Sequence, residues 1–279
     1  MPDFPFENAW EPGDDLRCFH FLDFVTNPKG FSIKIVELPR QLPLNWSQVA
    51  IALNFNPPPM TLPRQSTRIF LSERPNGPIS DGTFKLATTV LPRPAVDQVV
   101  VRVDYISLDP AMRLWLDDAR SYLPPIQIGE TIRAPGVGTV VQGNSQLKEA
   151  DTVYGFLGWA EYIIAPAKDL RKISDFLSPP EGAAVTDFLG PLGFNGMSAC
   201  FGLLSVGKIK AGETLVVSGA AGATGSLVCQ IGKIKGARVI GLASTLKCSY
   251  LVNQLGVDAA LDYTSPTFAK RFLRYCRVS

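Results

Sequence analysis

Histidine is almost missing from this sequence, since its 279 residues include only one, His20. A zinc site built from several histidines is therefore excluded, and any catalytic triad or Cys/His pair would depend on that one side chain. Cysteine is also sparse, and the wide spacing without any C-x-x-C pair predicts reduced thiols rather than disulfides or a metal site. The five cysteines are Cys18, Cys200, Cys229, Cys248 and Cys276. We expect no bound metal.

The chain also has little net charge and no long run of one sign. Lys and Arg number 27 against 25 Asp and Glu, which gives +2 at pH 7. A nucleic-acid binder usually has a clustered basic surface, so a nucleic-acid partner is not expected. The N-terminal residues are acidic rather than basic, which disfavours a secretory or mitochondrial targeting segment. We therefore expect a cytoplasmic protein.

One uncharged stretch has the length of a membrane span. Residues 214–232 carry no charged side chain, and a helix needs about 20 apolar residues to cross a bilayer. The stretch is rich in Gly, Ser, Thr and Ala, with its glycines gathered between Gly219 and Gly225 and β-branched residues before them. This layout predicts a strand, a turn and a helix, so we expect no membrane partner.

Prolines set the first part of the chain apart from the rest. Residues 1–66 contain many prolines between short apolar pieces, and prolines at this density interrupt both helices and interior strands. We expect an atypical, poorly ordered extension over these residues, with a folded module as the alternative. His20 lies in this extension, and we expect no catalytic role for it.

Short β-branched runs separated by turn signals follow in residues 67–185. The runs are 99–103, 138–141, 152–156 and 161–164. Their spacing predicts a compact, mostly β domain. Within it, Asp109 followed by Pro110 predicts the start of a helix, because proline at the first helical position loses no hydrogen bond.

Strands and helices alternate in residues 186–279. The expected strands are 215–217, 238–241 and 259–261, and the expected helices are 225–235 and 247–255. Alternation of this kind predicts a parallel sheet, because parallel neighbours need a crossover connection that is usually helical. The predicted fold class is therefore α/β, with a mostly β domain and a Rossmann-like domain.

A turn of small residues lies between the first strand and the first helix of this alternation, at residues 218–226 (SGAAGATGS). Small residues leave backbone N–H groups open to a pyrophosphate at the positive end of the helix. The spacing Ala220-x-Gly222-x-x-Gly225 is a variant of the dinucleotide-binding fingerprint, and its place between strand and helix favours coenzyme binding over a purely structural turn. The expected coenzyme contacts are Ala221, Gly222, Ala223, Thr224 and Gly225.

The end of the second strand bears on which coenzyme binds. Enzymes that use NAD usually place an Asp or Glu there, on a ribose hydroxyl. Residues 241–247 read GLASTLK and contain no acid. Ser244 can hydrogen-bond a ribose phosphate and Lys247 can neutralise it, which predicts NADPH. The alternative is that Lys247 is an ordinary solvated helix residue.

Several motifs resemble the medium-chain dehydrogenase/reductase superfamily and, within it, the zinc-free alkenal double-bond reductases that include the prostaglandin reductases. They are 68–71 (RIFL), 107–113 (SLDPAMR), 158–162 (GWAEY), 196–204 (GMSACFGLL), the glycine turn and 262–263 (DY). The resemblance implies a GroES-like β domain beside a Rossmann domain, and NADPH-dependent reduction of a C=C bond in an enal or enone. In such a reaction the coenzyme supplies the hydride, while the site polarises the carbonyl group.

The resemblance also implies site residues, by their positions in the motifs. Lys247 and Tyr263 match the contacts to the ribose phosphate, and Ser198 replaces the threonine near the nicotinamide. Met112 and Arg113 match the substrate site. Ala111 stands where the family has a tyrosine that lines this site, so substrate choice is not carried over. No catalytic side chain is assigned.

The last residues depart from the family. Residues 271–279 match none of its segments, and three strands are encoded where the usual order 3-2-1-4-5-6 has six. Two expectations follow. By descent the protein is an enal or enone reductase, whereas this polypeptide, truncated at its C-terminus, is a catalytically inactive remnant with at most partial dinucleotide binding. The strand at 215–217 is then expected to have an open edge.

Overall fold

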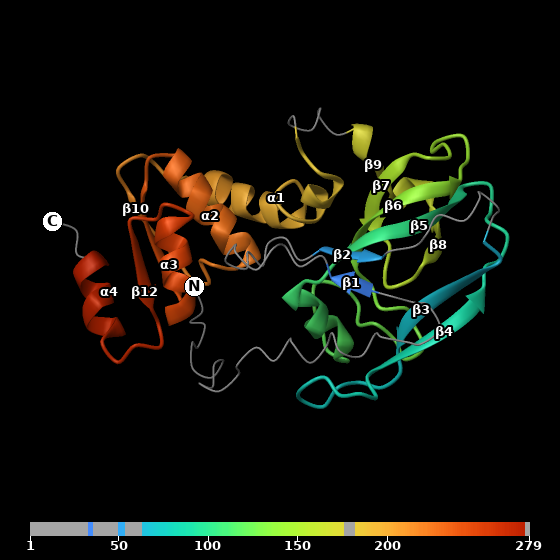
Figure 1. Cartoon of the computed structure of the whole chain (residues 1–279), viewed down its shortest axis with the longest axis horizontal. Coiled ribbons are helices and arrows are strands. Elements are labelled where there is room, and N and C mark those ends of the chain that lie inside the picture. The colour runs from blue at the N-terminus through green and yellow to red at the C-terminus, as the bar shows by residue number, and fades with distance from the viewer. Residues whose placement is uncertain (1–32, 36–49, 54–62, 176–181, 277–279) are drawn as a thin grey trace.

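The β-branched runs and the strand–helix alternation form two different sheets. The structure is a computed structural model that describes residues 33–35, 50–53, 63–175 and 182–276 (Figure 1). A mostly antiparallel β part and a parallel α/β part lie at opposite ends of the molecule, with the helical segment around α1 between them. The predicted fold class is confirmed.

The centre of the β part is β5 (Gln98–Ser107), in which Val99, Val101 and Val103 are fully buried. Antiparallel partners lie on both of its edges, because β6 pairs along most of its length while β8 and β2 pair with its two halves. The strands of this part after residue 62 are β3 (Gln65–Leu71), β4 (Phe84–Val90), β6 (Pro135–Gln142), β7 (Thr152–Phe156), β8 (Tyr162–Pro166) and β9 (Arg171–Lys172). Long β-branched runs thus produce the buried sheet that their pattern predicts.

Two short strands are described in the N-terminal extension, β1 (Ile33–Ile35) and β2 (Ala50–Leu53). They pair antiparallel with each other, and β2 pairs antiparallel with β5. The expected boundary between residues 66 and 67 falls inside β3. His20, Cys18 and most of the extension lie outside the described residues, so the expectation of poor order there stays a prediction.

Short helical segments occur within the β part and between the two parts. They are η4 (Pro110–Leu116), η5 (Ala167–Asp169), η6 (Ile173–Asp175), η7 (Val185–Leu189), α1 (Phe194–Cys200) and the π-helical η8 (Phe201–Val206). The helix start predicted at Pro110 is confirmed, and this helix has 3-10 geometry. From η7, Phe188 and Leu189 pack on Val137 and Ile173, which anchors the segment leading to α1 on the β sheet.

The α/β part contains the predicted alternation. Its elements are β10 (Thr214–Val217), α2 (Ala223–Ile234), β11 (Arg238–Ala243), α3 (Thr245–Asn253) and β12 (Ala259–Asp262). The three strands are parallel in the order β10-β11-β12. Residues 214–232 form a strand, a turn and a helix as predicted, and no helix in the described ranges is long and apolar enough to cross a membrane.

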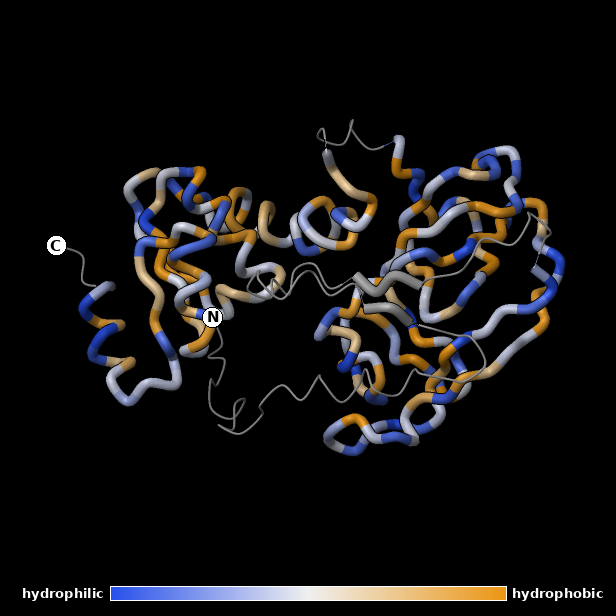
Figure 2. The backbone as a smooth tube through the Cα atoms, in the orientation of Figure 1, coloured by the Kyte–Doolittle hydropathy of each residue, from blue (hydrophilic) through white to orange (hydrophobic). Residues whose placement is uncertain are grey.

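A fourth helix, α4 (Phe268–Cys276), was not predicted. Phe268, Phe272 and Tyr275 repeat at helical spacing and pack against the buried side chains of Ile240 and Leu261. Figure 2 shows hydrophilic and hydrophobic residues alternating along this helix. The sequence analysis compared these residues with family motifs only. It therefore missed the helix, which is indicated by the helical spacing of its apolar side chains.

The packing of α3 on the sheet gives a first testable prediction. Leu251 is 0% exposed in the core between α2, α3 and the strands, whereas the next residue, Val252, is 43% exposed. Replacing Leu251 with Ala leaves a cavity and is expected to lower the free energy of unfolding by about 2–5 kcal/mol. Val252→Ala is the matched control, with an expected change within about 0.5 kcal/mol. Urea denaturation measures both, and equal effects would contradict this packing.

Candidate coenzyme site

The turn after β10 is held by its own backbone. Gly219 has a φ of +57°, a left-handed conformation that favours glycine. Its carbonyl oxygen accepts a hydrogen bond from the Gly222 N–H at 2.8 Å. The Ala220 N–H donates to the Leu242 carbonyl at 3.1 Å, which ties the turn to β11. These backbone contacts hold the turn in its conformation.

Gly225 brings α2 into contact with this turn. A Cβ atom at Gly225 would overlap the carbonyl group of Gly219 and would lie 3.0 Å from the Ala220 Cα. Only glycine lets the first turn of α2 approach this closely, which is the role of the third glycine in a dinucleotide fingerprint. The sequence analysis assigned the small residues to coenzyme binding, and the structure adds a role for Gly225 in packing.

The N-terminus of α2 presents hydrogen-bond donors. The first hydrogen bond within the helix runs from the Ser226 N–H to the Gly222 carbonyl at 2.9 Å. The N–H groups of Ala223, Thr224 and Gly225 precede it and have no partner within the helix. Residues 223–226 contain no acidic side chain. An anion can therefore be bound here by backbone donors and by the helix dipole.

Four of the five expected turn contacts lie at this helix start, and they are half-buried. They are Gly222, Ala223, Thr224 and Gly225. Ala221 differs, because it is buried in the core formed by α2, α3 and the strands. The structure thus brings the expected residues together, with the Ala221 methyl group directed into the protein core.

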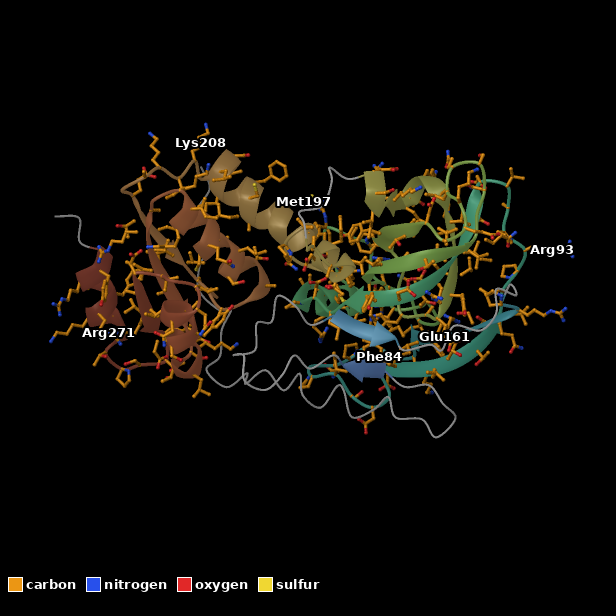
Figure 3. All side chains as sticks on the ribbon, turned by 45° about the horizontal axis from the view of Figure 1, so that its top comes forward. Phe84, Arg93, Glu161, Met197, Lys208 and Arg271 are labelled. Atoms are coloured by element: carbon orange, nitrogen blue, oxygen red, sulfur yellow. The ribbon has the colours of Figure 1, made fainter. Side chains whose placement is uncertain are left out.

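A side-chain hydrogen bond links this turn to α1. The Thr224 hydroxyl donates to the Asn195 Oδ1 at 3.0 Å. Ser198, the residue expected near the nicotinamide, is exposed and lies three residues after Asn195 on the same helix. Met197, labelled in Figure 3, marks this helix between the two parts of the molecule. Sequence reasoning missed Asn195, because its partner is 29 residues away.

The residues expected to bind the ribose phosphate gather at the carboxyl ends of β11 and β12. Ser244 is the N-cap of α3, and its carbonyl accepts a hydrogen bond from the Lys247 N–H at 2.9 Å. Tyr263 follows β12, its N–H donates to the Ala243 carbonyl at 3.3 Å, and its side chain is 54% exposed. A hydroxyl, an ammonium and a phenol thus occur at one edge of the sheet.

Asp262 also lies at this edge, and the sequence analysis named it within the motif at residues 262–263 without assigning it a role. The parallel register pairs Asp262 with Ala243, the last residue of β11. Hydrogen bonds to its carboxylate from Thr245 and Thr264, that from Thr245 contributing most, lower the pKa of Asp262. The second strand itself contains no acid, as the sequence indicated, but the neighbouring strand brings a carboxylate beside its end.

Met112 and Arg113, the expected substrate contacts, lie on η4 in the β part. Met112 is buried in the β core, and its sulfur accepts a hydrogen bond from the Asp109 N–H at 3.3 Å. The Arg113 guanidinium donates to Asp117 at 2.7 Å and to the Gly77 carbonyl at 2.8 Å. Their role toward substrate stays a prediction.

The described cysteine side chains are free thiols. Burial raises the pKa of Cys229 to about 12, and burial also raises the pKa of Cys248. In the ranges that the structure describes, His, Cys, Asp and Glu side chains form no group of three or more that could hold a metal ion.

Comparisons with known proteins all find oxidoreductases. Residues 67–173 match the family model described as the N-terminal domain of oxidoreductase. The chain is 38% identical over 215 residues to the NADPH-dependent curcumin reductase of Escherichia coli (strain K12), which covers 76% of this chain and 61% of that protein. It is 35% identical over 197 residues to prostaglandin reductase 1 of Mus musculus, covering 70% and 57%.

A solved structure shows the same similarity. CurA from Vibrio vulnificus in complex with NADPH superposes with a TM-score of 0.68 at 36% sequence identity. The match covers 75% of this chain and 61% of that chain. The chain therefore spans about six-tenths of the length of the curated relatives and solved structures that it matches.

The close approach at Gly225 gives a second prediction. Gly225→Ala places a methyl group against the Gly219 carbonyl, and overpacking of this kind is expected to lower the free energy of unfolding by about 1–3 kcal/mol. Gly202→Ala is the control, because a Cβ at Gly202 would meet no atom within 4 Å. Urea denaturation compares the two variants. A Gly225→Ala protein as stable as the control would contradict the contact.

The cysteines give a third prediction. Because the thiolate is the reactive form, a pKa of about 12 leaves about one Cys229 thiol in ten thousand ionised at pH 8. Native protein treated with iodoacetamide is expected to be labelled at the exposed Cys200 and not at Cys229. Both are expected to react in denaturant. Peptide mass spectrometry measures the labelling, and rapid modification of native Cys229 would contradict its burial.

Proposed function

Because the chain belongs to the medium-chain dehydrogenase/reductase superfamily, as its motifs predicted, we propose that its α/β part binds NADPH and that the protein reduces C=C bonds of enals or enones. The observation that carries the first half is the start of α2, where backbone donors and a close-packed glycine turn occur together. Relatives named NADPH-dependent curcumin reductase and prostaglandin reductase 1 support the second half.

The proposed coenzyme position follows from the charges of the coenzyme. The pyrophosphate lies at residues 222–225, because the N–H groups there carry the positive end of the helix dipole. The ribose phosphate lies near Ser244, Lys247 and Tyr263, which follow two adjacent strand ends. Ser198 on α1 is then on the side of the nicotinamide, and the Asn195–Thr224 hydrogen bond fixes α1 to the turn.

The proposed reaction needs few catalytic side chains. When bound, the coenzyme supplies the hydride that a conjugated double bond accepts at its β carbon. The protein then has to hold the substrate carbonyl toward a hydrogen-bond donor and exclude water. Met112 and Arg113 remain the proposed substrate contacts. We assign no residue to proton transfer.

A second candidate function is coenzyme binding without turnover. One observation favours it: among the described residues β10 is an edge strand, and its Val216 is exposed. Strand edges with apolar side chains usually pair or are covered. In this reading the chain retains the adenosine side of the site alone.

The coenzyme site is tested by a lysine substitution. Calorimetric titration of the chain with NADPH is expected to show binding, and Lys247→Ala is expected to weaken it about tenfold or more, because a charge-assisted contact to phosphate is lost. Lys235→Ala, at the opposite end of α2, is the matched control and is expected to leave affinity unchanged. Absence of heat with both NADPH and NADH would refute the proposed binding.

Turnover separates the two candidate functions. NADPH absorbance is followed in the presence of a small enone, with the Lys247→Ala protein in parallel. Steady loss of absorbance that is slower in the variant at limiting NADPH supports the reductase. Tight NADPH binding with no loss of absorbance above that of NADPH and enone without protein would refute the reductase and support binding alone.

A further inference from the structure

A carboxylate lies where a phosphate-binding site is proposed. In dinucleotide folds an acid at the end of the second strand accepts hydrogen bonds from the ribose and repels a ribose phosphate. Here β11 has no such acid, but its last residue, Ala243, pairs with Asp262 of β12. Asp262 therefore occupies the neighbouring position at the same sheet edge, one residue before Tyr263.

Both oxygens of the Asp262 carboxylate already accept hydrogen bonds within the protein. The Thr245 hydroxyl donates to Oδ2. The Thr264 N–H and hydroxyl donate to Oδ1 at 2.8 and 2.6 Å. The donors to the two oxygens come from different segments. Thr264 is two residues after Asp262 in the chain, whereas Thr245 belongs to the first turn of α3.

Thr245 therefore links the carboxylate to the segment that carries two of the proposed phosphate contacts. It lies between Ser244 and Lys247 in sequence, and it begins the helix that carries Lys247. A hydroxyl that donates to a carboxylate also offsets part of the negative charge that reaches a nearby anion. Arg271 of α4, labelled in Figure 3, adds a positive charge that contributes to lowering the pKa of Asp262.

We propose that Thr245 is the specificity-determining residue of this site, because its hydroxyl competes with an unphosphorylated ribose for Asp262 Oδ2 and offsets part of that oxygen's negative charge toward a ribose phosphate. The inference rests on the proposed coenzyme function. With Thr245 in place, a ribose hydroxyl gains only a weak hydrogen bond from the carboxylate. Lys247 favours the phosphorylated ribose, because its ammonium attracts the phosphate. Without that hydroxyl, Oδ2 has no competing donor from α3, so it accepts a hydrogen bond from a ribose hydroxyl more readily and repels a phosphate more strongly.

The test compares two ligands that differ by one phosphate, 2′,5′-ADP and 5′-AMP, by calorimetric titration of the full chain at fixed ionic strength. The wild-type chain is expected to bind 2′,5′-ADP more tightly. Thr245→Ala is expected to reduce the ratio of the two affinities by about tenfold, because a hydrogen bond to a charged group changes partner. Thr245→Ser keeps the hydroxyl and is expected to restore the wild-type ratio.

Two further variants separate specificity from a structural effect. Ser249→Ala removes an exposed hydroxyl elsewhere on α3 and is expected to leave the ratio unchanged. Asp262→Asn in the Thr245→Ala background removes the charge and is expected to return the preference toward 2′,5′-ADP.

The outcomes are distinguishable. An unchanged ratio in Thr245→Ala, or an equal loss of affinity for both ligands, overturns the role of Thr245 while the coenzyme site stands. A wild-type chain that binds neither ligand overturns the proposed coenzyme site, and the inference with it.

Discussion

The contact between the first turn of α2 and the turn after β10 is the constraint on which the site depends. At Gly225 the helix backbone approaches the Gly219 carbonyl so closely that no side chain fits between them. This approach sets the direction of the N–H groups at the helix start. The hydrogen bond from the Ala220 N–H to the Leu242 carbonyl then fixes the same turn relative to β11. A shift at Gly225 would therefore move the donors away from the strand ends that carry the other contacts.

Positive charge surrounds this turn, with one carboxylate opposing it. The helix start offers a positive end with no acid in its first turn, and Lys247 adds an ammonium at the next helix. Asp262 is the opposing charge, and its hydrogen bonds to Thr245 and Thr264 keep it directed into the protein's own donors. In the proposed site, the preference for a phosphorylated or an unphosphorylated ribose is thus a balance between the Lys247 ammonium and the hydrogen-bonded Asp262 carboxylate.

Much of the fold could be predicted because its signals are local. Alternating β-branched and helical segments, and glycines between a strand and a helix, follow from near neighbours in sequence. α4 was also encoded locally, in the spacing of Phe268, Phe272 and Tyr275, but was missed because motif comparison ignores periodicity. The pairing of β2 with β5 was beyond prediction, since it joins segments about 55 residues apart whose register depends on the whole sheet.

The sequence by itself determined the two kinds of sheet, the glycine turn and the residue types able to bind a phosphorylated coenzyme, because each depends on backbone preferences and on side chains within one short segment. Tertiary structure alone decided which groups from separate segments meet. Parallel register placed Asp262 beside Ala243, and helix packing joined Asn195 to Thr224. Contacts of this kind depend on how elements pack in three dimensions, and no local pattern of residues encodes which distant segments meet.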